Sequence, residues 1–225
     1  MAFGYYPVAK ILYGSNNYCL NTPTSDKDYY MIAIPSWNAL FKNREISSKL
    51  DDNTVVWDIR KFCKLLMEAK PNTLELLFSV EQIIVDPNFK EVLNCARENV
   101  GSIIRTNWIS FTKSVKGMAE NSVKRDDMTP KTVSRAVYLH YLWENVAKSN
   151  GNMTEETWRG DFVKIPKEIR SHEKLTLYDK IEYQFGAKDW SETKYAVVPT
   201  EEDYKKCEEI QQKILDYLIH YLTKN

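Results

Sequence analysis

Short apolar runs in the first part of the chain predict β-strands. Four such runs, rich in β-branched and aromatic residues, occupy 8–13, 28–34, 54–59 and 82–85. Runs of this length and composition, bounded by turn residues, are typical of strands. The polar and mixed stretch 36–52 between the second and third runs predicts an irregular excursion.

From residue 60 the apolar residues recur at helical spacing. Phe62, Leu65, Leu66 and Ala69 mark the first predicted helix, which Pro71 is expected to end. Further helices are predicted at 74–78, around 92–96, at 104–118, from Thr129-Pro130 to near Asn150-Gly151, and from the capping sequence Thr200-Glu201-Glu202-Asp203 onward. A helical turn is also expected at 16–20.

Strands therefore gather before residue 86 and helices fill the rest, which predicts the α+β class. We expect an N-terminal unit with a small sheet at 1–98 and a helical C-terminal unit at 99–225.

Charge and composition narrow the function classes. Lysine plus arginine and aspartate plus glutamate both number 31, so the formal net charge is zero. A protein built chiefly to hold long nucleic acid normally carries a basic excess, although a local basic groove is compatible with this balance. The four cysteines and three histidines form no zinc-like pattern. The sequence shows no signal peptide or membrane-spanning segment, so we expect a cytoplasmic protein that has no membrane partner.

The most informative stretch joins a Gly14-Ser15 turn to Asp26 and Asp28. On a strand, residues two apart point to the same face, so both aspartates are expected to project together. Adjacent carboxylates repel each other, and hard Mg²⁺ prefers carboxylate and phosphate oxygens. Backbone N–H groups of a small turn, together with Ser15, suit the terminal phosphates of a nucleotide. The stretch predicts metal-assisted phosphate chemistry.

Asp58 is a candidate third carboxylate. It stands in the apolar run Val55 to Ile59. If that strand lies beside the strand of Asp28, the three carboxylates meet at one end of the sheet and hold two Mg²⁺ ions. Asp58 would then share the second ion and help deprotonate an acceptor hydroxyl. The alternative is that Asp58 caps the helix that begins at Arg60.

These residues resemble the DNA polymerase β-like nucleotidyltransferase superfamily. The stretch GSNNYCLNTPTSDKDYYMI is similar to the bacterial and phage family of predicted nucleotidyltransferases, whose core reads GS-x-x-Y-G-L-x-T-P-x-S-D-x-D. Residues 57–78, which include Asp58, resemble its second block, and Lys131 to Ala136 more weakly resembles its basic helix. The likeness covers roughly the first 140 residues. Cys19 departs from the usual Gly, and Pro71-Asn72 replaces a common Asn-Pro.

The resemblance implies a small mixed β-sheet nucleotidyltransferase core with a C-terminal helical bundle. It implies transfer of an NMP from an NTP, with ATP expected, to an acceptor hydroxyl with release of pyrophosphate. Mg²⁺ is the expected cofactor, with Mn²⁺ as a substitute, held by Asp26, Asp28 and Asp58. Gly14 and Ser15 would bind the nucleotide. Lys131 and Arg135, four residues apart on one helix face, would contact the triphosphate or acceptor, or else form a solvated surface.

The acceptor stays open between a protein side chain, a small molecule such as an aminoglycoside, and an RNA 3′ end. Zero net charge counts modestly against RNA. The competing hypothesis is a catalytically inactive, nucleotide-binding regulator or antitoxin-like protein of the same fold. Three intact carboxylates argue against it, because like charges held together are unfavourable and an inactive site does not need them. The oligomeric state is open.

Overall fold

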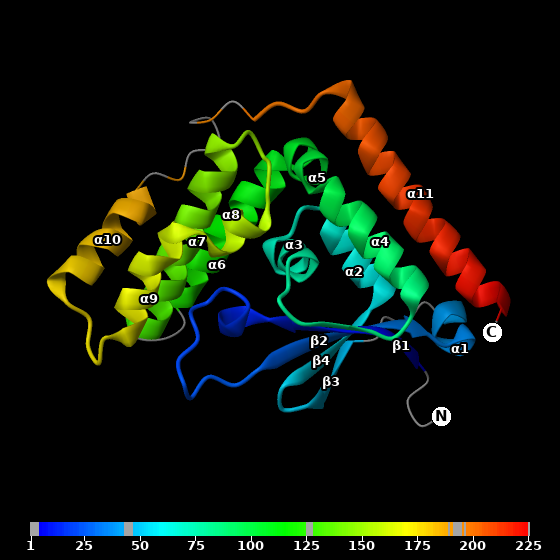
Figure 1. The fold of residues 1–225 in the computed structure, drawn as a ribbon, viewed down its shortest axis with the longest axis horizontal. Helices are drawn as coiled ribbons and strands as arrows, with labels where there is room; N and C mark the ends of the chain where they lie inside the picture. The colour runs from blue at the N-terminus through cyan, green and yellow to red at the C-terminus, as the bar shows by residue number, and fades with distance from the viewer. Residues whose placement is uncertain are drawn as a thin grey trace.

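A five-stranded mixed sheet forms the base of the molecule (Figure 1). The computed structural model describes residues 5–42, 47–124, 128–188, 190, 195 and 197–224. The strands are β1 (Tyr5–Tyr13), β2 (Asp28–Pro35), β3 (Ser47–Asp51), β4 (Thr54–Asp58) and β5 (Gln82–Ile84), in the spatial order β3-β4-β2-β1-β5. Strand β2 pairs antiparallel with β1 and parallel with β4.

The described helices lie mainly above this sheet in Figure 1. In chain order they are η1 (Gly14–Asn16), α1 (Trp37–Phe41), α2 (Ile59–Met67), α3 (Pro71–Leu77), α4 (Pro87–Glu98), α5 (Val100–Thr106), α6 (Trp108–Lys124), α7 (Pro130–Lys148), α8 (Glu155–Arg159), η2 (Asp161–Val163), α9 (Lys164–Ser171), α10 (Leu177–Lys188) and α11 (Glu201–Lys224). Helices α6, α7, α9 and α10 pack together as a bundle, and α11 returns across α5, α4 and α2.

The structure confirms the α+β class with a C-terminal helical bundle. Thr129 caps α7 as expected, in a reciprocal pair of hydrogen bonds with Thr132. Two predictions at the level of elements were wrong. The stretch 36–52 contains α1 and β3, with 43–46 outside the described residues, and the helix expected at 104–118 is divided at Asn107 into α5 and α6. Pro71 also opens α3 as its first residue, where proline needs no N–H partner.

One buried core runs through both predicted units. The cluster extends from Val8 in β1 through Phe62 in α2 and Trp143 in α7 to Tyr217 in α11. Tyr217 donates a hydrogen bond to Asp86 at 2.8 Å, which joins α11 to the start of α4. The predicted boundary at 98/99 falls between α4 and α5 and stays a prediction. Because α11 packs back over α2 and α4, the C-terminal helix contributes to the core on the sheet's side of that boundary.

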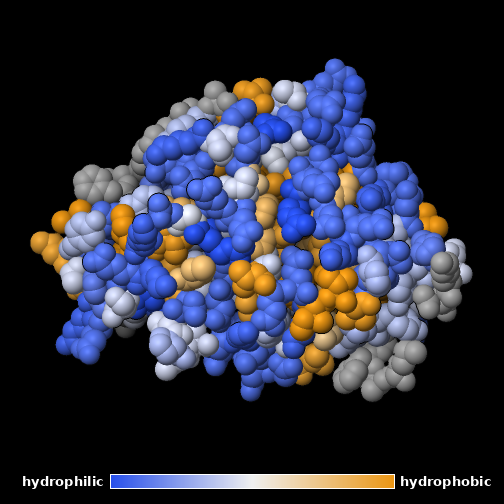
Figure 2. All heavy atoms as spheres, viewed as in Figure 1, coloured by the Kyte–Doolittle hydropathy of each residue, from blue (hydrophilic) through white to orange (hydrophobic). Residues whose placement is uncertain are grey.

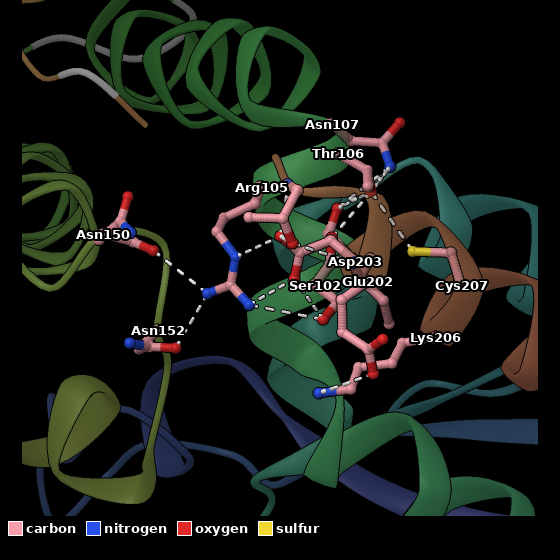
Figure 3. Close-up of polar contacts among 12 residues, drawn as sticks. Ser102, Arg105, Thr106, Asn107, Asn150, Asn152, Glu202, Asp203, Lys206 and Cys207 are labelled. Atoms are coloured by element: carbon pink, nitrogen blue, oxygen red, sulfur yellow. Dashed lines mark hydrogen bonds and ion pairs between the residues drawn. The ribbon is translucent and has the colours of Figure 1, made fainter. Parts of the chain in front are cut away.

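A buried ion pair fixes the start of α11 on α5 (Figure 3). The Asp203 carboxylate accepts from Arg105 at 2.6 and 3.0 Å and from the Ser102 hydroxyl at 2.7 Å. Arg105 also donates to Asn150 and Asn152, so it ties the loop after α7 to the same cluster. The guanidinium of Arg105 holds the pKa of Asp203 well below its usual range.

We predict that Asp203→Asn lowers the free energy of unfolding by about 3 kcal/mol, because the substitution leaves the Arg105 charge poorly paired in a buried site. Urea denaturation measures the loss. Glu202→Gln is the matched control, since it removes a negative charge one residue away that makes only an exposed contact with Lys206 at 3.8 Å. Such surface pairs contribute at most about 1 kcal/mol. Equal midpoints for the two variants would contradict the prediction.

Candidate active site

Strand pairing brings the glycine turn to the first aspartate of β2. Tyr13, the last residue of β1, pairs with Asp28, the first residue of β2, and Gly14 follows immediately. Gly14 has φ +79, a conformation that glycine adopts without strain. The turn then forms η1, where the N–H groups of Ser15 and Asn16 open the 3₁₀ turn and have no partner within it. The turn and the carboxylate therefore lie side by side, as the sequence predicted.

Asp26 and Asp28 interact although they do not share a strand. β2 begins at Asp28, so Asp26 lies in the preceding loop and is exposed. The Asn16 side chain donates to the Asp26 carbonyl at 2.6 Å and ties that loop to the turn. Burial raises the pKa of Asp28, the negative charge of Asp26 raises it further, and Lys131 opposes both effects. The prediction that both aspartates project from one strand is wrong, because Asp26 lies in the loop before β2, although its charge still acts on Asp28.

Glu75 of α3 lies beneath the turn and is almost completely buried. Its carboxylate accepts from the Gly14 N–H at 2.5 Å, from the Asn17 side chain at 3.3 Å and from the Tyr18 hydroxyl. Burial raises the Glu75 pKa to about 7, although these three hydrogen bonds and Arg135 lower it. The Gly14 N–H is thus used inside the protein, which leaves the following N–H groups of the turn for a ligand.

A cavity of about 330 Å³ opens beside the turn. Gly14, Ser15 and Asp28 line one side of it, and Asn72 and Glu75 of α3 line another. Tyr13 and Tyr30 also line it, with ring centroids 4.0 Å apart, and the Trp57 ring, outside the lining, lies 3.9 Å from that of Tyr30. Cavities of this size are typical of small-molecule ligands.

Three cations complete the lining. Lys131 and Arg135 enter from α7, and Arg170 enters from the end of α9. None of the three forms an ion pair with another residue that the structure describes. Arg135 lowers the pKa of Glu75 and of the neighbouring tyrosines, and partial burial lowers the pKa of Arg170 itself. The predicted basic helix face is therefore directed at the cavity, and sequence reasoning missed its third member.

Asp58 lies apart from this cavity. β4 runs beside β2, but the strands are parallel, and Asp58 pairs with Ala33 rather than with Asp28. Ala33 is about 16 Å along β2 from Asp28, at roughly 3.3 Å per residue. Asp58 is completely buried, accepts from the Arg60 N–H at 2.9 Å and pairs with the Arg60 guanidinium at 2.8 Å. The predicted convergence of three carboxylates is wrong, and the alternative that Asp58 caps α2 is confirmed.

Asp26 and Asp28 are the candidate ligands for a hard cation. Asp26 acts on the pKa of Asp28, and neither forms an ion pair with a residue in the described ranges. A divalent cation removes the repulsion of such a pair. Across the same ranges, no three acidic, histidine or cysteine side chains group closely enough to hold a metal. Asp58 cannot share an ion with Asp28, because metal–oxygen bonds are only about 2.0–2.6 Å long.

The backbone conformation at Cys19 explains why glycine is usual at this position in the family that the sequence resembles. It has φ +60, in the left-handed region where a side chain costs roughly 1 kcal/mol or more. The Leu20 N–H donates to the Ser15 carbonyl at 2.9 Å across this bend, so the conformation closes the turn. The turn is therefore retained without glycine, at some conformational cost.

Comparison with protein families identifies the chain. Residues 8–150 match the RNA repair pathway DNA polymerase beta family, and this is more than half of the 225 residues. The chain belongs to this family. The match confirms the DNA polymerase β-like nucleotidyltransferase superfamily, which indicates nucleotidyl transfer from an NTP and, in general, the use of divalent metals. Searches of curated proteins and of solved structures returned no match.

Two residues of the cavity carried little signal in the sequence. Glu75 is a single charged residue in the apolar stretch 74–78, for which the sequence analysis predicts only a helix. Arg170 lies beyond the matched residues 8–150, and only the packing of α9 against α7 brings it to the cavity. The one signal that could have found Glu75 is its charge within an apolar helix, since a buried charge requires partners.

Glu75 makes stability depend on pH. Its pKa of about 7 in the folded protein exceeds the ordinary 4.5, so the folded protein keeps a proton that the unfolded chain releases. Stability should therefore fall as pH rises from about 4.5 to 7, by up to about 3 kcal/mol from this group. Glu75→Gln, which resembles the protonated form, should flatten the fall in thermal midpoint over this range. A variant whose profile parallels the wild type would refute the assignment.

Proposed function

We propose that the protein transfers an NMP from an NTP, with ATP the expected donor, to an acceptor hydroxyl and releases pyrophosphate. The acceptor oxygen bonds to the α-phosphorus, the bond from that phosphorus to the leaving pyrophosphate breaks, and the hydroxyl proton passes to water. Family membership supports nucleotidyl transfer, and the geometry of the cavity supports the nucleotide as its ligand.

One observation carries the proposal: a single cavity combines Asp28 and the Gly14-Ser15 turn with three cations that form no ion pair among the described residues. A triphosphate with a divalent cation is bound by groups of both signs. Its phosphate oxygens attract lysine and arginine, and its metal attracts carboxylate. A site for a neutral ligand would leave these charges uncompensated.

Each group has a distinct part in this proposal. The N–H groups of Ser15 and Asn16 bind terminal phosphate oxygens, and Lys131, Arg135 and Arg170 surround the same charge from the opposite wall. Asp26 and Asp28 would hold Mg²⁺, with Mn²⁺ as a substitute. When bound, the cation neutralises charge that builds up on the transferring phosphate. Tyr13 and Tyr30 offer ring surface to the ribose or base.

RNA is the acceptor that the family favours. The description of the matched family names an RNA repair pathway, which supports an RNA end over a protein side chain or a small molecule. The zero net charge of the chain does not contradict this choice, since a local basic surface suffices for a short stretch of RNA.

One finding favours the competing hypothesis of an inactive, nucleotide-binding regulator. The described residues contain no group of three metal-binding side chains, and Asp58 lies away from the cavity. The regulator would bind NTP without forming pyrophosphate. The two hypotheses therefore differ in turnover and agree on binding.

The first test is transfer of label from an α-³²P-labelled NTP to RNA or to cell extract in the presence of Mg²⁺. We expect Asp28→Asn to lower transfer at least 100-fold, on the order of 3 kcal/mol in the barrier, because Asp28 is one of the two carboxylates that would hold the metal. Asp58→Asn should retain transfer at a temperature where it is folded, while its thermal midpoint drops. Retained NTP binding with no pyrophosphate from the wild type would support the regulator.

A second test concerns Arg170. Arg170→Ala should raise the KM for NTP about 10-fold or more with a smaller change in kcat, because a charge-assisted contact to the triphosphate is lost. Arg170→Lys should recover part of the loss. Lys167→Ala is the control, since Lys167 is exposed on the same helix and does not line the cavity. Equal KM values for the two alanine variants would remove Arg170 from the site.

A further inference from the structure

Tyr18 joins the glycine turn to the helices across the cavity. Its backbone N–H donates to the Gly14 carbonyl at 3.1 Å, so the residue closes the turn that begins at Gly14. Its hydroxyl donates to the buried Glu75 carboxylate, which also accepts the Gly14 N–H. Tyr18 is only 4% exposed, so protein covers most of its ring. The side chain is therefore placed to support the site rather than to contact a ligand.

Aromatic contacts hold the Tyr18 ring against α7 and α8. Its centroid lies 4.7 Å from that of Tyr138 in α7 and 5.8 Å from that of Trp158 in α8. Tyr138 and Trp158 are buried, and the Tyr138 hydroxyl donates to the Trp158 carbonyl at 3.1 Å. Ring pairs at about 4.5–7 Å stabilise a structure beyond the area that they bury. A buried contact therefore joins the turn to these two helices.

The same face of α7 carries two of the cavity's cations. Lys131, Arg135 and Tyr138 are spaced i, i+4, i+7, so they lie along one stripe of the helix. Lys131 and Arg135 line the cavity, and Tyr138 at the end of the stripe contacts Tyr18. Burial raises the pKa of Tyr18 well above its usual value, and the nearby positive charge of Arg135 opposes this effect. The position of the cations relative to the turn therefore depends on Tyr18.

We propose that Tyr18 is a positioning residue of the nucleotide site. Its ring sets the distance between the turn, whose N–H groups bind the terminal phosphates, and the cations of α7 on the opposite wall. A triphosphate contacts both walls at once, and its charge-assisted hydrogen bonds form over a narrow range of distance, at about 2.7–2.9 Å. A small shift of one wall against the other then weakens binding by a large factor. This inference rests on the proposed function, because it takes the triphosphate to bridge the two walls.

Phe78 offers a matched comparison within the same aromatic cluster. It follows α3, it is buried, and its ring centroid lies 6.4 Å from that of Trp158. Phe78 does not line the cavity. A general loosening of the core would follow from the loss of either ring, whereas a positioning role belongs to Tyr18 alone.

Calorimetric titration of the full chain with ATP and Mg²⁺ tests the proposal, at a temperature where circular dichroism shows each variant to be folded. We expect Tyr18→Leu to raise the Kd for ATP about 10-fold, because the two walls lose their fixed separation. Tyr18→Phe, which keeps the ring, should stay within about threefold of the wild type. Phe78→Leu should lower the thermal midpoint and leave the Kd within about twofold of the wild type, because it destabilises the core away from the cavity.

A double-mutant cycle with Arg135→Gln separates positioning from a general loss of stability. Because Tyr18 acts through the α7 cations, Tyr18→Leu should weaken ATP binding by no more than about threefold in a protein that already lacks the Arg135 charge. Additive effects would overturn the proposal, as would an unchanged Kd in Tyr18→Leu. If that variant does not fold, Tyr138→Leu removes the same contact from α7 and decides the result in the same cycle.

Arg170 separates this inference from the proposed function, because it reaches the cavity from α9 and not from α7. Weaker ATP binding in Arg170→Ala together with unchanged binding in Tyr18→Leu would leave the proposed function standing and refute the inference alone. A wild-type protein that does not bind ATP would refute both. Calorimetry detects binding without turnover, so the result does not depend on finding the acceptor.

Discussion

The buried Glu75 carboxyl is the constraint on which the rest of the site depends. It accepts the Gly14 N–H and the Tyr18 hydroxyl, so it fastens α3 to the turn that follows β1. Burial in the core raises the pKa of Glu75 above its ordinary value. The hydrogen bonds that Glu75 accepts there hold the turn in a fixed position. Asp28 lies beside that turn through strand pairing, and the α7 cations face it across the cavity.

Local sequence was enough to identify the half of the site that is built from neighbouring residues. Gly14 and Asp28 meet because β1 and β2 pair antiparallel with Tyr13 opposite Asp28, and the pattern of apolar runs already indicates both strands. Thr129-Pro130 likewise predicts the start of α7, and the start of the helix determines which face carries Lys131 and Arg135. These features depend on short-range chemistry: caps, turns and alternation.

Asp58 and Arg170 show where such reasoning ends. An apolar run predicts that β4 is a strand, but its direction and register follow from the whole sheet, and here parallel pairing places Asp58 opposite Ala33. The same residue satisfied a local rule, helix capping, that competed with the functional reading. Arg170 reaches the cavity only through packing of α9 on α7, a contact that no local pattern encodes. Ile83 and Val85 at the β5 edge of the sheet are the reverse case, because these apolar residues are exposed. Figure 2 shows that apolar patches lie among the polar side chains on the viewed face.

The contact between α5 and α11 joins residues inside the family match to residues outside it. The family match ends at residue 150, yet Arg105 inside it has its carboxylate partner at Asp203, and Arg170 also lies outside it. A fragment cut at the end of the match would leave a buried guanidinium without its counter-charge and an open seam where α11 covers α4 and α5. The residues that match the family model are thus fewer than those that form the core, because helices after residue 150 also contribute to it.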